Sequence, residues 1–211
     1  MQDTATCRDV GMSTAQDIFP DCTMTLAQAL LHRVSVREFT STIVNRAVVQ
    51  SLLEAAVRAP TAMHQEACGF VVIQDRALLR KISDFAKPLF LEELHRTHRD
   101  RGGNAPAILS DPNLDIFHGA RTLVVICGPM TAPFIDADCW LAAENFMLAA
   151  HAMALGTCVI GSAVSALSTP EIRRTIELPN HLRPIAPIAL GTPRRPCEPS
   201  PRKSPLVVNW I

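Results

Sequence analysis

The sequence of 211 residues lacks an excess of charge of either sign, because Lys and Arg together number 20 and so do Asp and Glu. Without a net positive charge, the chain has no overall field that would hold a polyanion or an anionic membrane surface. It also lacks a run of 18 apolar residues, since four polar residues interrupt the richest stretch, 137–155. That stretch is predicted to be a buried helix and not a membrane span. We therefore expect neither nucleic acid nor a membrane as a partner.

Several familiar signatures are also missing. The seven cysteines are odd in number and never spaced as C-x-x-C, which favours reduced thiols in a cytoplasmic protein. Residues 1–23 have no basic start followed by an apolar run, so they resemble no signal peptide, and residues 1–24 are expected to form a disordered N-terminal extension. There is no P-loop, no glycine-rich pyrophosphate turn and no Ser, His and Asp set with hydrolase spacing.

What the sequence does contain is apolar. Hydrophobic residues make up 48% of the chain and its mean hydropathy is +0.16, which leaves room for a large apolar interface beyond the core. The length suits one domain, residues 25–211, that completes its core with a second copy. We expect a homodimer.

Periodicity and capping residues predict alternating helices and strands along this domain. Helices are expected over 25–33, from Asn45 to before Pro60, after Asp75, from Asp136 to a stop at Gly156, and from Thr169. Strands are expected over 69–74, 123–127, 158–160 and 185–190, a long loop or lid over 92–118, and an extended proline-rich tail over 191–211. The tail ends in apolar residues, which suggests that it docks on another surface.

Two basic groups are candidates for an anion site. If the segment 33–37 is extended, Arg33, Ser35 and Arg37 share one side, and two guanidinium groups around a hydroxyl suit a phosphate. A solvated basic strand is the alternative. The second group lies in the tail and consists of Arg194, Arg195, Arg202 and Lys203. A solvated polar tail is the alternative there.

Six motifs in order, from about residue 25 to the end, resemble those of the nitroreductase superfamily. The first is Arg33-x-Ser35-x-Arg37-x-Phe39, which is similar to the family's R-x-S-x-R-x-F. The others are the segment 53–66 with Ala59-Pro60-Thr61, the strand 69–72, the alanine-rich central helix, 155–161 with Leu155-Gly156-Thr157, and 189–193 followed by the basic pair Arg202-Lys203.

The resemblance implies an α+β fold in which helices flank a central, mainly antiparallel sheet, and an intertwined homodimer that binds FMN between its subunits. It implies hydride transfer from NAD(P)H through flavin N5 to a small nitroaromatic, quinone or enone acceptor by a ping-pong mechanism, with no catalytic side chain. Arg33 and Ser35 would hold the phosphate, Arg37 the pyrimidine edge, and residues 60–64 would come from the other subunit. Asn113 is added from loop spacing. The residues implied to bind the cofactor are Arg33, Val34, Ser35, Arg37, Pro60, Thr61, Ala62, His64, Asn113, Ile160, Gly161, Ser162, Arg202 and Lys203.

The sequence departs from the family pattern at one place. His64, Glu66, Ala67 and Cys68 stand where the family has Asn, Gln, Pro and Trp. This leaves two alternatives open: another flavin reaction, such as dehalogenation, flavin fragmentation or azoline oxidation, or a flavin-binding protein without turnover. Cys68 is interpreted as a packing residue. His95 and His98 lack a third ligand at metal spacing, so no metal site is predicted.

Overall fold

The computed structural model describes residues 23–97, 105–199 and 201–211. Four strands form one sheet in the order β1-β2-β4-β3, and every neighbouring pair is antiparallel. The strands are β1 (Gly69–Ile73), β2 (Thr122–Pro129), β3 (Gly156–Val159) and β4 (Leu182–Gly191). The predicted antiparallel sheet with flanking helices is confirmed. The predicted extension 1–24 lies almost entirely outside the described residues.

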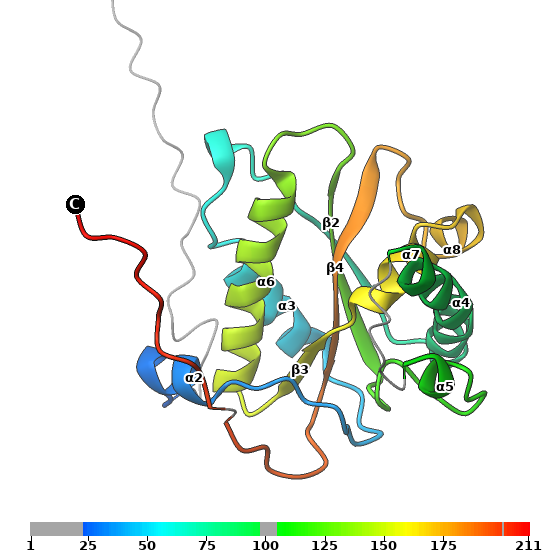
Figure 1. Cartoon of the computed structure of the whole chain (residues 1–211), viewed down its shortest axis with the longest axis horizontal. Coiled ribbons are helices and arrows are strands. Elements are labelled where there is room, and N and C mark those ends of the chain that lie inside the picture. The colour runs from blue at the N-terminus through cyan, green and yellow to red at the C-terminus, as the bar shows by residue number, and fades with distance from the viewer. Residues whose placement is uncertain (1–22, 98–104, 200) are drawn as a thin grey trace, which may run out of the picture.

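Helices cover both faces of this sheet (Figure 1). On one side lie α3 (Arg46–Ala56) and α6 (Ile135–Ala152), and on the other α4 (Arg76–Arg96), α7 (Val164–Leu167) and α8 (Pro170–Thr175). The remaining elements are α2 (Leu26–His32), α5 (Ala105–Leu109) and the 3₁₀ turns η1 (Ala62–His64) and η2 (Gly161–Ala163).

The alternation of side chains along β2 explains the three layers. Leu123 and Val125 pack into the core on the α4 side, whereas Val124 and Ile126 pack into the core on the α3 and α6 side, and all four are fully buried. Because successive strand residues point to opposite faces, an uninterrupted apolar strand needs helices on both.

Capping residues set several helix starts. The side chains of Thr25, Asn45, Asp75 and Thr169 each accept a hydrogen bond from a backbone N–H in the first turn of the following helix. Such bonds satisfy donors that would otherwise have no partner. The predicted starts are therefore confirmed.

Two expectations about the chain's path are wrong. The segment 92–118 is not one long loop, because α4 continues to Arg96 and α5 follows, although residues 98–104 lie outside the described part. Gly156 does not stop α6: the helix ends at Ala152, and Ala154 takes the left-handed conformation with φ 57°. Gly156 begins β3, where an added Cβ would lie 2.6 Å from Val36 Cγ2, so it is needed for close packing.

Candidate functional site

The basic segment 33–37 lies beside β3. Ser35 forms a parallel β-bridge with Thr157, and the Val36 N–H donates to the Thr157 carbonyl over 2.9 Å. Val36 is buried, whereas Ser35 and Arg37 are exposed. The segment is therefore extended, with its apolar residue directed into the core and the hydroxyl and guanidinium outward.

The direction of this pairing sets the order of Arg33 and Arg37 along β3. Because the bridge is parallel, the segment runs the same way as β3, so Arg37 lies on the side of Gly161, which follows β3. Burial raises the pKa of the Cys158 thiol and Arg37 opposes that rise, which places Arg37 near the end of β3. Arg33 lies at the opposite end of the segment.

Arg33 packs against α6. Its Nε lies 3.7 Å from the Glu144 carboxylate, and its side chain is only 17% exposed. The pKa of His151 is lowered by burial, and further by Arg33 and His32. Since residues 144 and 151 are seven apart, they share one face of the helix. Arg33 thus lies over this face of α6. The Glu144 carboxylate already pairs with Arg33 and would compete with a bound phosphate for its charge.

His118 is a neighbour of Arg37 that the sequence did not indicate. Burial lowers its pKa and the charge of Arg37 lowers it further, with Asp115 opposing. Its backbone has φ 58° and that of Gly119 has φ 83°. In the sequence, the pair His118-Gly119 indicates a turn, but no pattern indicates that this turn lies near Arg37.

Gly161 exposes an open patch of backbone at the end of β3. The Ile160 N–H donates to the Pro187 carbonyl over 2.8 Å, and the Ile160 side chain is buried, so the backbone here is held in place. Gly161 is exposed, and a Cβ built on it meets no atom within 4 Å. Ser162 is half-buried. This surface leaves room for a flat ring to approach the chain closely, so the residues present fit a flavin.

The segment 60–68 lies at the other end of α6. The Ala62 N–H donates over 3.0 Å to Asp138, whose side chain is buried. Met63, His64 and Glu66 have positive φ values of 56°, 51° and 46°. Such backbone is uncommon for residues other than glycine and is found at ligand clamps and active sites. Pro60 and His64 are exposed, and Thr61 is half-buried.

One chain does not bring the two halves of the predicted site together. Asp138, which holds Ala62, and Glu144, which contacts Arg33, are six residues apart on α6, or about 9 Å along its axis and about 120° around it. In Figure 1 the 62–64 turn lies beside one end of α6, and α2 with the following segment beside the other. Asp138 itself was missed, because a single carboxylate in an apolar helix shows no partner in the sequence.

The tail and Asn113 also lie apart from the basic segment. The beginning of the tail is held by Glu38, through a 3.0 Å bond from the Arg194 N–H and a 2.7 Å ion pair with Arg195. Arg202 and Lys203 are exposed and form no ion pair with any described residue. Asn113 is exposed on the loop that Lys87 holds through the Pro112 carbonyl.

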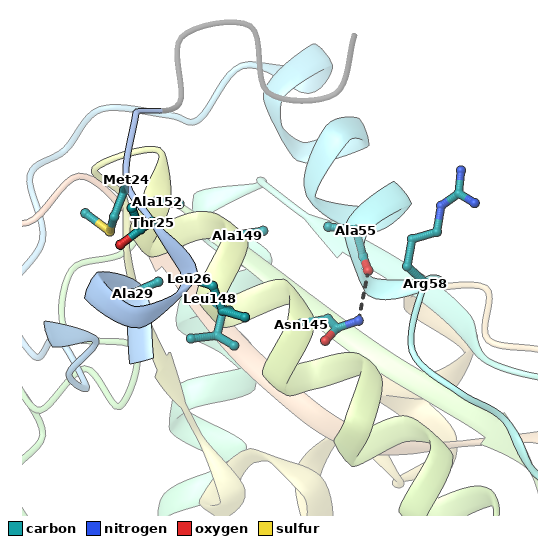
Figure 2. A pocket seen from close by; sticks show the side chains of 10 residues that line it. All are labelled: Met24, Thr25, Leu26, Ala29, Ala55, Arg58, Asn145, Leu148, Ala149 and Ala152. Carbon is teal, nitrogen blue, oxygen red and sulfur yellow. Dashed lines mark hydrogen bonds between the residues drawn. The ribbon is translucent and has the colours of Figure 1, made fainter. Parts of the chain in front are cut away.

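Beyond the site, one side of the molecule is apolar and uncovered. α6 exposes Trp140 and Leu141, and α2 exposes Leu26, Leu30 and Leu31. A hollow of ≈ 290 Å³ lies among α2, α3 and α6. Figure 2 shows Leu26, Ala29 and Leu148 at this hollow, with Asn145 donating to the Ala55 carbonyl over 3.3 Å. Within one chain α6 is thus buried or half-buried along most of its surface, as expected, and Trp140 and Leu141 lie on the part that remains exposed.

The described residues lack two other kinds of feature. In the described ranges, no cluster of three or more His, Cys, Asp or Glu side chains is arranged to hold a metal ion. None of the described helices has both the length and the apolar character that a membrane crossing needs.

Comparison with known proteins gives a consistent result. Residues 30–192 match the model of the Nitroreductase family. The FMN reductase [NAD(P)H] of Bacillus subtilis is 26% identical over 186 residues, which cover 84% of this chain and 69% of that protein. The FMN-bound nitroreductase of Bacteroides fragilis superposes with a TM-score of 0.73 at 20% identity, over 90% of this chain and 99% of that one. Iodotyrosine deiodinase, solved with FMN and 3-iodo-L-tyrosine, has a TM-score of 0.65 at 20% identity, over 89% of this chain and 100% of that one.

Proposed function

Because the chain belongs to the nitroreductase family, we propose that it is an oxidoreductase that binds FMN without a covalent bond and transfers hydride from NAD(P)H to a small organic acceptor. Nitroaromatics, quinones and enones are the acceptor classes. When bound, the flavin supplies the hydride transfer itself, at N5. The chain's own residues bind the cofactor, orient it and adjust the charge around it.

One observation carries this proposal: the segment 33–37 runs parallel to β3 at the edge of the sheet, and the exposed Gly161 follows that strand. The parallel bridge between Ser35 and Thr157 sets the order along it, with Arg33 distal and Arg37 toward Gly161. A molecule with a phosphate at one end and a flat ring at the other matches that order. Arg33 and Ser35 would bind the phosphate, and Arg37 would place positive charge beside the pyrimidine edge.

A second copy would complete the site. If α6 packs antiparallel against α6 of a partner, the partner's segment 60–64 comes to the end of this chain's helix where the segment 33–37 lies, away from this chain's own segment 60–64. The exposed side chains of Trp140 and Leu141 supply the apolar surface for such an interface. Arg202 and Lys203 would reach the phosphate as part of the same assembly. Closed twofold symmetry would give two equal sites.

The order of substrates is proposed to be ping-pong. NAD(P)H and the acceptor would use the same open face above Gly161, so the oxidised nicotinamide leaves before the acceptor enters. No side chain of the described site is placed as a nucleophile, which suits a reaction whose bond-making occurs on the cofactor.

A spectrum and a titration test the proposal. The purified protein should absorb as a flavoprotein, release FMN and not FAD on denaturation, and lose the oxidised-flavin absorbance when NADH or NADPH is added without oxygen. A colourless protein that cannot be reconstituted with FMN would refute it.

The segment 64–68 favours one further candidate, a reductive dehalogenation on the same cofactor. His64 and Glu66 have positive φ and are exposed where they would cover the flavin of a partner, and a relative in fold was solved with an iodinated amino acid. Turnover with NAD(P)H and halogenated phenols, followed by halide release, would distinguish this reaction from nitro or quinone reduction.

A further inference from the structure

A second pocket, away from Gly161, lies where β2 begins and β4 ends. It is a hollow of ≈ 330 Å³, and Phe39 forms part of its apolar wall. Four arginines also line it, from three separate parts of the chain: Arg76 and Arg80 on α4, Arg121 before β2 and Arg194 after β4.

The positive charge in this pocket is poorly balanced. Among the described residues that line it, Asp115 is the one carboxylate. Both of its oxygens are engaged within their own loop, where they accept 2.9 Å hydrogen bonds from the N–H groups of Phe117 and Gly119. Among the described residues, Asp115 forms no ion pair with any of these four arginines.

Three of the four guanidinium groups have no partner of their own. Arg80 is engaged by Asp84 over 3.2 Å and by the Pro112 carbonyl. The side chains of Arg76, Arg121 and Arg194 form no hydrogen bond or ion pair with any described residue, and Arg121 Nε is buried without an acceptor. A buried donor without a partner loses its hydration and gains nothing in return, so native proteins rarely leave one unmatched.

The backbone adds to the same field. Arg76 is the first residue of α4, and this helix is 21 residues long. The Asp75 side chain already accepts from the Leu78 N–H at this terminus, and first-turn N–H groups that are left without such a bond attract anions. Near neutral pH a phosphate monoester carries almost two negative charges and several acceptor oxygens, and guanidinium groups bind such oxygens in pairs.

We infer that this pocket, lined by Arg76, Arg80, Arg121 and Arg194, binds the phosphate group of a small phosphorylated molecule. A volume of ≈ 330 Å³ exceeds what one phosphate needs and falls in the range of small-molecule sites. The inference is independent of the proposed flavin chemistry, because none of Arg33, Ser35 and Gly161 lines this pocket.

Calorimetric titration of the protein with inorganic phosphate and with adenosine 5′-monophosphate tests this inference. The protein is first saturated with FMN, so that any phosphate site for the flavin is filled, and ionic strength is held constant. Saturable binding of both probes is expected. Similar affinities would identify a site for the free anion, and tighter binding of the nucleotide would identify a site that also holds the organic part.

Two variants and a matched control locate the site. Arg76→Ala and Arg121→Gln should each weaken phosphate binding roughly tenfold or more, because each removes a charge-assisted hydrogen bond. Arg76 is exposed, so its replacement leaves the core intact should Arg121→Gln prove unstable. Arg46→Ala is the control, since Arg46 is exposed and holds the same first position in α3. No saturable binding up to about 10 mM phosphate, or an equal loss in the control, would overturn the inference.

Discussion

At the scale of single residues, the candidate site depends on the space that a glycine leaves open and on the charge that an arginine supplies. Gly161 and Gly128 illustrate opposite uses of the same residue. A Cβ on Gly161 meets nothing within 4 Å, whereas a Cβ on Gly128 would overlap the Ile135 side chain. The first glycine faces free space that a ligand can use, and the second allows α6 to approach the sheet.

These two glycines give a matched pair of variants. Gly161→Ala should leave the unfolding temperature of the flavin-free protein unchanged but weaken FMN binding, because the methyl group enters the space of the ring. Gly128→Ala should lower the free energy of unfolding by about 1–3 kcal/mol, through overpacking. Thermal unfolding and flavin fluorescence measure the two effects. Equal FMN affinity in Gly161→Ala and the unmodified protein would show that the ring lies elsewhere.

Arg33 and Glu144 give a second residue-scale prediction, with effects of opposite sign. Arg33→Ala should weaken FMN binding roughly ten- to a hundredfold, because one charge-assisted hydrogen bond to a phosphate contributes about 1.5–3 kcal/mol. Glu144→Gln should strengthen FMN binding, since it removes the carboxylate that lies 3.7 Å from Arg33 Nε. Fluorescence titration measures both dissociation constants. If both variants bind FMN as the unmodified protein does, Arg33 serves only the ion pair.

At the scale of elements, the C-terminal tail holds two kinds of exposed residue. Arg202 and Lys203 carry charge, and the last residues carry exposed apolar surface, with Trp210 88% exposed. Leu206 and Val208 at the end of this proline-rich arm are as exposed as Trp210, so they bury little apolar surface in one chain. A partner subunit would cover these side chains, and the cations would then be held near its phosphate.

Two variants of the tail test this division. If the tail docks on a partner, a chain that ends at Pro205 should dissociate from the proposed dimer more readily, because it loses the apolar end of the tail while it keeps both cations. The double variant Arg202→Ala and Lys203→Ala should keep the dimer and bind FMN more weakly. Analytical ultracentrifugation measures the first effect and flavin titration the second. A tail that only extends into solvent would leave both measurements unchanged.

At the scale of the whole molecule, folding stability should depend on pH through two histidines. Burial lowers the pKa of His118 and of His151 below 6.5, with help from Arg37 in the first case and from Arg33 and His32 in the second. The unfolded chain therefore binds more protons than the folded chain once the pH drops below about 6.5. This contribution is fully present above that pH and is lost as the pH falls.

Denaturant unfolding from pH 7.5 to pH 5.5 should show this loss. The free energy of unfolding should decrease, and His118→Asn should reduce the decrease, because Asn does not titrate and tolerates the positive φ at this position. His95→Gln serves as the control, since His95 is exposed on α4. An unchanged slope in His118→Asn would contradict the prediction.

Patterns in the sequence were sufficient for most elements and for the order of the motifs. Helix starts were predictable at Thr25, Asn45, Asp75 and Thr169, because a capping residue acts within one turn of the helix. Short apolar runs in the sequence predicted the strands. The extent of α4 was not apparent, since none of its residues after Lys87 is buried and its second half therefore has weak apolar periodicity. The end of α6 was misplaced because Ala154, and not a glycine, takes the left-handed turn.

Local features could be read from the amino-acid order alone: the extended basic segment, the small residue after β3, the capped helices and the high apolar content. The tertiary structure decided which of these features meet. It placed Arg37 toward Gly161 through a parallel bridge, joined Arg33 to Glu144, and gathered four arginines from distant positions around one hollow. Such meetings depend on how the layers pack, and packing contacts between residues far apart in the chain have no periodic signal in the sequence.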